Sequence, residues 1–177
     1  MRLGFTGTKY GISKFQEESF IKVLEALYEY TECFSHGDCV GADKRAHQIV
    51  LRLPINIHIF PPNKRIYKAF TFESSPGLCL VNPLTSSEDI IAVKKCLNGV
   101  DIFLHKADDY LSRDRSIVRN SDVLVACPGQ NSEQIRSGTW YTIRQARKRK
   151  IPIYKIFPMG KIEVENKLNL NFQLKIG

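Results

Sequence analysis

The repeated order of apolar run, glycine turn and helix start is the feature that most constrains the fold of this chain. An apolar run over 122–129 ends in Pro-Gly, and a helix-like stretch follows at 136–146. The same order occurs over 34–47, and a glycine turn also follows the apolar run at the N-terminus, over 3–9. Parallel strands joined by helices require this order, and their carboxyl ends meet along one rim where ligands bind. We therefore expect an α/β fold, a doubly wound and mostly parallel sheet with helices on both faces.

Hydrophobic spacing predicts where the elements lie. Ser13 and Gln16 have the spacing of a capping box at a helix start. The apolar stripe that follows at helical spacing consists of Phe20, Val23, Leu24, Leu27 and Tyr28. Strands are expected at 2–6, 32–36, 55–60, 122–126 and 152–157. Further helices are expected at 41–53, 64–72, 88–98 (capped by Ser87), 110–120 and 139–150. The tail, 161–177, alternates weakly and could pair as an edge strand.

Composition limits the class of protein and its partners. At 177 residues the chain fits a single domain. It has no signal-peptide pattern and no apolar run near the ~18–20 residues of a membrane span, so we expect a cytoplasmic protein. The five cysteines include no Cys-x-x-Cys pair, and the four histidines lack metal-ligand spacing, which favours reduced thiols and no metal. Cys39, in a glycine turn, is either reactive or a small space-filling residue.

The net charge favours an anionic partner. The formal charge is +8 and the pI is about 9.3. Such a balance suits nucleotides, nucleic acid or an acidic surface without choosing among them. The basic cluster at 147–150 either contacts such a partner or only places cations at a helix C-terminus, where the dipole favours them.

The start of the helix predicted at 139–150 holds the strongest candidates for ligand contact. The first N–H groups of a helix have no intrahelical partner and the dipole is positive there, so a phosphate can bind. Gly138 and Thr139 would supply N–H groups, and the hydroxyls of Ser137 and Thr139 would add hydrogen bonds. Arg136 would add charge. Trp140 either stacks on a base or packs in the core.

Two earlier glycine turns supply further candidates. Residues 7–9 either contact a phosphate or ribose or form an ordinary turn. In the next turn, Gly37 and Gly41 fit a positive φ or a close backbone approach. Asp38 could accept hydrogen bonds from ribose hydroxyls or a base. Asp43 either contacts the ligand or only places a negative charge at a helix start.

Charged side chains on two predicted helices complete the set. His47 lies one helical turn after Asp43, so the two could pair, or His47 could be a structural histidine. Arg115 and Arg119 share one face of the helix at 110–120, and Arg113 lies off that face. Arginine suits bidentate phosphate binding, and the alternative is a salt-bridged surface helix.

Several of these motifs, in their order, resemble one known group of proteins. The motifs are Thr6-Gly7-Thr8, His36-Gly37-Asp38-Cys39-Val40-Gly41-Ala42-Asp43 with Ala46-His47, Pro61-Pro62, residues 110–118 and residues 136–143. They resemble the SLOG superfamily, which joins the fold of DNA-processing protein A with the lysine-decarboxylase-like (LOG) nucleotide enzymes. The resemblance spans most of residues 2–160. It implies a Rossmann-like domain that binds nucleotides or nucleotide-derived ligands, often as a homodimer or higher oligomer. Residues 70–105 have no counterpart in it and are expected to be an insertion, and 161–177 a C-terminal extension.

One position departs from the phosphoribohydrolase branch of this superfamily. That branch carries Pro-Gly-Gly-x-Gly-Thr-x-x-Glu, whose glutamate supports N-glycosidic cleavage. Thr142 stands at the glutamate position here and cannot act as a carboxylate base. This departure argues against hydrolysis of that type.

Three functions follow from the sequence as alternatives. The first is a sensor or sequestering protein for a phosphorylated ribonucleotide, a cyclic nucleotide or an ADP-ribose-type signal, bound at the carboxyl-terminal rim with no other cofactor. The second is a single-stranded nucleic-acid-binding module like DNA-processing protein A, although few aromatic residues interleave with the basic ones. The third is a nucleotide N-glycosidic hydrolase that uses other carboxylates, such as Glu73, Glu88 or Glu133. The candidate ligand-binding residues are Gly7, Thr8, Lys9, Gly37, Asp38, Gly41, Asp43, Arg115, Arg136, Ser137, Gly138 and Thr139.

Overall fold

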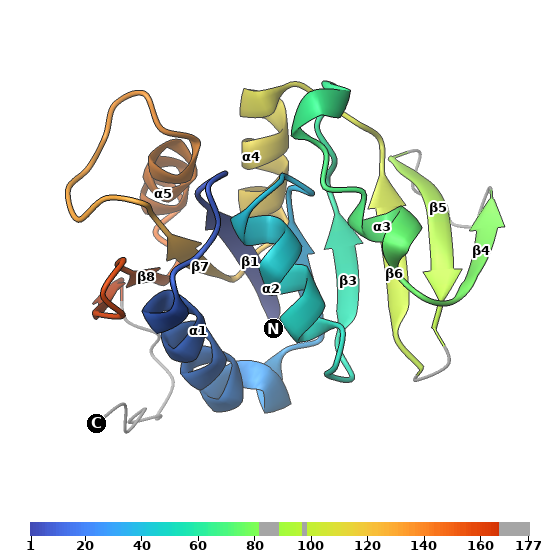
Figure 1. The fold of residues 1–177 in the computed structure, drawn as a ribbon, viewed down its shortest axis with the longest axis horizontal. Coiled ribbons are helices and arrows are strands. Elements are labelled where there is room, and N and C mark those ends of the chain that lie inside the picture. The colour runs from blue at the N-terminus through green and yellow to red at the C-terminus, as the bar shows by residue number, and fades with distance from the viewer. Residues whose placement is uncertain (82–88, 97–98, 167–177) are drawn as a thin grey trace.

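The chain folds around one nine-stranded sheet with the order β4-β5-β6-β3-β2-β1-β7-β8-β9 (Figure 1). The structure, a computed structural model, describes residues 1–81, 89–96 and 99–166. The strands are β1 (Arg2–Gly7), β2 (Cys33–His36), β3 (Asn56–Ile59), β4 (Leu78–Val81), β5 (Ile90–Lys95), β6 (Asp101–His105), β7 (Val123–Cys127), β8 (Ile153–Ile156) and β9 (Ile162–Glu165). The helices are α1 (Lys14–Leu27), α2 (Ala42–Val50), α3 (Thr71–Ser74), α4 (Tyr110–Arg119) and α5 (Gly138–Lys148), with single 3₁₀ turns at Tyr28–Tyr30 and Arg65–Tyr67.

The centre of the sheet is parallel and its two edges are antiparallel. Strands β6, β3, β2, β1, β7 and β8 run parallel to one another, whereas β5 pairs antiparallel with β4 and β6, and β9 pairs antiparallel with β8. The predicted fold class is therefore confirmed. The first and last of the predicted strands, at 2–6 and 152–157, are also confirmed, as β1 and β8. Because the central strands are parallel, their carboxyl ends form one rim, as the glycine turns require.

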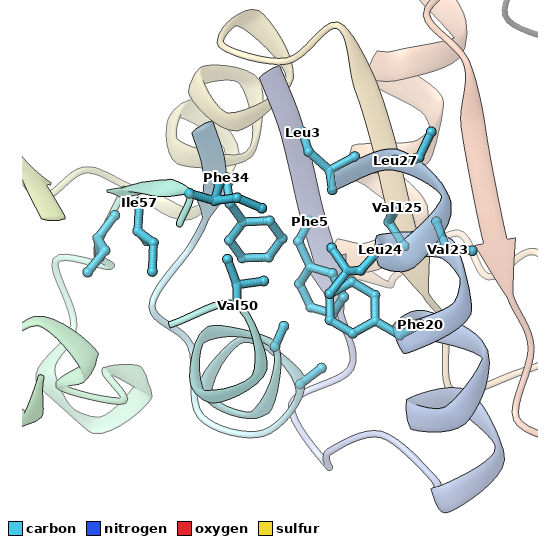
Figure 2. Packing of buried hydrophobic residues seen from close by; sticks show 14 of the residues in the cluster. Leu3, Phe5, Phe20, Val23, Leu24, Leu27, Phe34, Val50, Ile57 and Val125 are labelled. Carbon is cyan, nitrogen blue, oxygen red and sulfur yellow. The ribbon is translucent and has the colours of Figure 1, made fainter. Parts of the chain in front are cut away.

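One face of the sheet packs on α1 and α2 around a cluster of aromatic rings (Figure 2). The ring of Phe20 on α1 lies 5.1 Å from that of Phe5 on β1, and Phe34 on β2 lies 5.9 Å from Phe5. The predicted stripe on α1 is buried except for its last member, Tyr28, because the helix passes into a 3₁₀ turn there. Apolar burial on this face is the main stabilising term for the sheet.

The opposite face packs on α4 and α5. Trp140, Ile143 and Ala146 on α5 contact Leu124 and other apolar residues of the central strands. The pattern matches the helical spacing of i, i+3 and i+6 on one side of α5. The sheet therefore has helices on both faces, as predicted.

The predicted capping box fixes the start of α1 and ties it to the rim. The Ser13 hydroxyl accepts from the Gln16 N–H at 3.1 Å, and the Gln16 amide oxygen accepts from the Ser13 N–H at 3.0 Å. The Gln16 side-chain nitrogen also donates to the carbonyls of Pro128 and Ile156. A residue predicted only as a cap thus also joins α1 to the ends of β7 and β8.

The helix predicted at 88–98 is wrong, because Ile90–Lys95 forms strand β5. β-branched residues in this stretch, such as Ile90, Ile91 and Val93, lose side-chain freedom in a helix and suit a sheet. Pairing with β4 and β6 on its two sides then decides the conformation. Ser87, the predicted cap, lies outside the described residues.

Other boundaries also differ from the predictions. The helix predicted at 64–72 is broken into a 3₁₀ turn and α3, because Phe70 has a left-handed backbone with φ 57°. Helix α2 ends at Val50, before the predicted residue 53. The predicted edge strand in the tail is confirmed as β9, and residues 167–177 lie outside the described part. None of the described helices has both the length and the apolar character needed to cross a bilayer.

Candidate functional site

The loops that follow β1, β2 and β7 meet at the carboxyl-terminal rim. The Thr8 N–H donates to the Cys127 carbonyl at 3.2 Å, which joins the ends of β1 and β7. The Thr8 carbonyl accepts from the Ala42 N–H at 3.1 Å, which joins the end of β1 to the start of α2. The second turn of α5 lies near β1 as well, since the hydroxyls of Thr6 and Thr142 are 3.4 Å apart. The structure thus brings the three predicted glycine turns together.

The glycines of the first two turns are required by the packing of the chain on itself. Gly41 has φ 90°, and a Cβ there would lie 2.3 Å from the Lys9 carbonyl oxygen. A Cβ on Gly7 would lie 2.3 Å from the Cβ of Ala42. The expected positive φ and close backbone approach are therefore present at Gly41. What approaches it is the backbone of the loop after β1, and a ligand role for both glycines stays a prediction.

Asp38 is bound by a residue far away in the sequence. It has a left-handed backbone with φ 51° and is fully buried. Its Oδ1 accepts from the Thr71 N–H at 2.9 Å and from the Thr71 hydroxyl at 2.5 Å, while its Oδ2 has no hydrogen-bond partner among the described residues. Burial raises the pKa of this carboxyl, and the bonds from Thr71 oppose the shift. Asp38 therefore anchors α3, and its contact with a ligand stays a prediction.

A chain of buried hydrogen bonds connects the same loop to α3 by a second route. The Asp38 N–H donates to His36 Nδ1 at 3.1 Å, so His36 carries its proton on Nε2. His36 Nε2 then donates to His47 Nδ1 at 3.0 Å, and His47 Nε2 donates to the Ser75 hydroxyl at 2.7 Å. Burial lowers the pKa of both histidines, that of His47 to about 4. The pairing of His47 with Asp43 that the spacing allowed is wrong, because His47 binds His36 and Ser75 instead.

A buried cluster of charges lies below this loop. Arg113 of α4 donates to Asp114 Oδ1 at 3.1 Å and to the Cys39 sulfur at 2.9 Å. Asp43 Oδ2 accepts from the Cys39 N–H at 3.1 Å, and a Cβ on Gly37 would lie 3.0 Å from it and 3.1 Å from Arg113 Nε. Burial raises the pKa of Asp43 to about 7, although Arg113 opposes the shift. Gly37 is thus needed where the two charged groups come together.

Burial also governs the Cys39 thiol. Its pKa is raised to about 12, so the thiol stays protonated at neutral pH. A thiolate is the nucleophilic form of cysteine. The structure therefore favours the space-filling interpretation of Cys39 over the reactive one.

Arg113, rather than the predicted Arg115, is the arginine that points into the fold. Arg113 is 6% exposed, whereas Arg115 is exposed and donates to the nearby Ser112 hydroxyl at 3.1 Å. A signal for this was present in the sequence. Residues i and i+4 share one face of a helix, and Arg113 lies four residues before the apolar Ile117. A ligand role for Arg115 stays a prediction.

The start of α5 differs from the other two turns because its first N–H groups, those of Gly138 and Thr139, have no partner among the described residues, although Thr139 is only 6% exposed. Ser137 caps the helix, and its hydroxyl accepts from the Trp140 N–H at 3.4 Å. The first turn of α5 contains no acidic residue, and Arg136 just before it is exposed. Gly138 lies against Tyr110 of α4, because a Cβ there would be 2.7 Å from the Tyr110 hydroxyl oxygen. An anion could therefore meet the N–H groups of Gly138 and Thr139, which the described part of the chain leaves unpaired, without an acidic side chain in the same turn.

The carboxylates proposed for glycosidic hydrolysis gain no support from their surroundings. Glu133 pairs with Arg147 at 2.6 Å and Arg144 at 3.1 Å, and these bonds lower its pKa, which is the opposite of what a general acid needs. Glu73 pairs with Lys68 at 2.8 Å. Thr142 is fully buried and donates to the Gly138 carbonyl at 3.0 Å. Glu88 lies outside the described residues.

Aromatic side chains do gather among the basic residues of the rim, which corrects the interpretation from sequence. Tyr10, Tyr67 and Tyr110 are 85%, 43% and 47% exposed, and each belongs to a different rim segment. The ammonium group of Lys9 lies 5.1 Å from the Tyr10 ring centroid, and Arg65 is exposed next to Tyr67 in its 3₁₀ turn. Lys9 and Tyr10, like Tyr67 and Lys68, are neighbours in sequence, but the three tyrosines are far apart along the chain, so only the fold brings them to the same rim.

Comparison with known proteins supports the fold. No protein-family model and no curated protein matches the chain. Among solved structures it is similar to DNA processing protein A from Helicobacter pylori, whose structure concerns single-stranded DNA binding, at 16% identity and a TM-score of 0.54 over 96% of this chain and 67% of that one. The chain has the Rossmann-like fold of DNA processing protein A. It also aligns with the structural genomics target TM1055 at 18% identity and a TM-score of 0.47 over 86% of this chain and 71% of that one.

Proposed function

We propose that the rim binds a nucleotide or a nucleotide-derived ligand, with a phosphate at the start of α5. The observation that carries this proposal is the acid-free first turn of α5, opened by Ser137, Gly138 and Thr139 and preceded by the exposed Arg136. Unpaired N–H groups, a positive dipole end and a guanidinium together favour a phosphate.

Neighbouring elements would hold the rest of the ligand. The loop after β1 carries Thr8 and Lys9 beside the loop after β7, since a Cβ on Gly129 would lie 3.4 Å from the Thr8 hydroxyl. Tyr110, next to Gly138 and half exposed, offers a ring on which a base can stack. Since Thr142 replaces the catalytic glutamate of the resembling hydrolases, sensing or sequestration is the activity that we propose.

The test compares two exposed cations at opposite ends of α5. Titration calorimetry with AMP, ADP and ADP-ribose should show binding to the native chain. Arg136→Ala should weaken it at least about tenfold, because a charged hydrogen bond to phosphate is lost. Lys148→Ala, which removes a cation from the other end of the helix, should leave it unchanged. Equal effects of the two substitutions, or no binding of any of these nucleotides, would contradict the proposal.

A second candidate is binding of single-stranded nucleic acid along the same rim. The exposed Tyr10, Tyr67 and Tyr110 alternate with cations such as Lys9 and Arg65, as in stacking surfaces for single strands. The structural neighbour with the same fold is described as binding single-stranded DNA. Fluorescence anisotropy with a labelled oligothymidine should show an affinity that falls steeply with salt.

Matched tyrosine substitutions separate this candidate from nucleotide binding. Tyr67→Ala should weaken oligothymidine binding at least about fivefold, because a stacked base loses its aromatic partner. Tyr28→Ala removes a partly exposed tyrosine at the far end of α1 and should have no effect. A salt-independent affinity, or the same affinity for both variants, would leave nucleotide binding as the function of the rim.

A further inference from the structure

A hollow of about 480 Å³ lies between α5, the loop after β7 and the hairpin of β8 and β9. Its lining contains none of the residues proposed for the rim. Trp140 and Arg147 both line it, and they lie two helical turns apart on one side of α5. The hollow therefore runs along the length of the helix rather than across its start. Its size is within the range of small-molecule sites.

One wall of the hollow is apolar. It consists of Trp140 and Phe157, which are 2% and 6% exposed, and of Met159, which is 71% exposed. The indole Nε1 of Trp140 is buried and has no hydrogen-bond acceptor among the described residues.

The other wall is charged, and its acidic groups are fully engaged. Glu163 accepts from Lys155 at 3.1 Å with one oxygen and from Lys161 at 2.8 Å with the other. The oxygens of Glu165 bind Arg147 at 2.7 Å and Lys155 at 2.8 Å. An ammonium group has three N–H bonds, and the described residues give the nearly buried Lys155 two carboxylates, while its Nζ also lies 5.5 Å from the ring centroid of Phe157 in the apolar wall.

This wall therefore has spare donors and a spare positive charge. Both oxygens of Glu133 are also taken, one by Arg144 and one by Arg147. Three of the cations that line the hollow (Arg147, Lys155 and Lys161) thus face two lining carboxylates (Glu133 and Glu163), and Arg144 and Glu165, which do not line it, add one charge of each sign to the same network. A ligand that fits must bring an acceptor with one negative charge, together with an apolar body for the opposite wall.

We propose that this hollow binds a small aromatic carboxylic acid. The aromatic body lies against Trp140, Phe157 and Met159, where burial of apolar surface favours it. The carboxylate accepts from the third N–H of Lys155, and its charge is balanced by the excess cation of the network. The site is independent of the rim, so it stands or falls separately from nucleotide binding.

The single tryptophan of the chain gives a specific readout. Trp140 is the one tryptophan among the 177 residues, so the ¹⁵N-labelled full chain has one indole N–H cross-peak in its NMR spectrum. Biphenyl-4-acetate should shift this cross-peak in a saturable way. Biphenyl-4-acetamide, which has nearly the same shape without the charge, should bind at least about tenfold more weakly, because a charged hydrogen bond becomes a neutral one.

Three variants locate the binding. Lys155→Met keeps an apolar side chain of similar length but removes the donor, and it should weaken binding at least about tenfold. Met159→Glu places a negative charge on an exposed wall residue, where the fold tolerates it, and should weaken binding to a similar extent. Lys148→Met, on α5 outside the hollow, should bind as the native chain does.

The result that would overturn the proposal is equally specific. It fails if the acid does not move the indole cross-peak, if the acid and the amide bind equally well, or if Met159→Glu binds the acid as tightly as the native chain. Nucleotide titrations on the same samples report on the rim, so loss of one activity does not imply loss of the other.

Discussion

The starts of α2 and α5 look alike in sequence and differ in what the fold does with them. Each follows a parallel strand and a glycine turn, and each has small residues at its first turn. At α2 the chain itself supplies the hydrogen-bond partners. The Ala42 N–H donates to the Thr8 carbonyl, and the Asp43 carboxyl group accepts from the Cys39 N–H. At α5 no acidic residue occupies the first turn.

This difference shows that a glycine turn before a helix is not a sufficient sign of a phosphate site. Close packing of the chain on itself can require the glycine just as a ligand can. What distinguishes the two starts is whether the first turn of the helix itself carries a carboxylic acid, as Asp43 does in α2. Each prediction below would sharpen or break this contrast.

The largest effect is expected from removing the cation that compensates the buried carboxyls near α2. Arg113→Leu should lower the free energy of unfolding by about 3–5 kcal/mol, because Asp43 and Asp114 lose their buried partner. Arg115→Leu, two residues along the same helix and exposed, should change it by less than about 0.5 kcal/mol. Urea denaturation measures the free energy of unfolding of both variants. Equal losses of stability would mean that the buried charge cluster does not stabilise the start of α2.

The buried histidine chain should make the α2 side sensitive to acid. The pKa of His47 falls from its ordinary 6.5 to about 4 in the folded chain, so the unfolded chain binds a proton more readily between these values. The contribution of His47 to stability is therefore fully present above about pH 6.5 and declines as the pH falls towards 4, by about 3 kcal/mol in total.

His47→Gln isolates this contribution from the other groups that titrate nearby. The free energy of unfolding of the native chain, minus that of the variant, should decrease as the pH falls through this range. His36 adds a slope of the same sign, while Asp43 and Asp114, whose pKa values are raised, add the opposite one, and these largely cancel in the difference. A difference that does not change with pH would show that His47 is not buried as a neutral group.

A smaller effect is expected from the glycine that lets the first two loops meet. Gly41→Ala should lower the free energy of unfolding by about 2 kcal/mol, because the new Cβ strains a positive φ and meets the Lys9 carbonyl at 2.3 Å. Gly11→Ala has a similar φ of 99° but open space around it, and about 1 kcal/mol is expected. If thermal or urea unfolding gave the same loss for both, the close contact would be unimportant.

The smallest change in stability should come with the clearest change in binding. Ser137→Asp places a partly exposed, ionised carboxylate at the start of α5, so the free energy of unfolding should rise by about 0.5 kcal/mol while nucleotide binding is lost. Ser137→Asn, a neutral cap of the same shape, should retain binding. If the aspartate variant bound nucleotide as the native chain does, the start of α5 would not be the phosphate site.

Much of the fold could be predicted from local patterns. The capping box at Ser13, the stripe on α1 and the strand at 122–126 were all found by spacing, because each depends on neighbours in sequence. Strand β5 was not found. Residues 90–95 fit either element locally, and pairing with strands on both sides decides between them.

The candidate site divides in the same way. The sequence located the turns at the rim, because strand direction alone brings them to one edge. It did not show that Asp38 binds Thr71, or that Arg113 rather than Arg115 points inward. These partners come from segments that meet only when helices pack on the sheet.

The sequence by itself determined the parallel sheet, its helices and the rim at which the glycine turns lie, since these follow from short-range spacing and strand direction. Only the tertiary structure decided which polar groups at that rim are hydrogen-bonded within the chain and which are left for a ligand. The reason is that each buried polar group needs a partner, and several of these partners, such as Thr71 for Asp38, Cys39 for Arg113 and Thr142 for Thr6, lie from tens of residues to more than a hundred away along the chain.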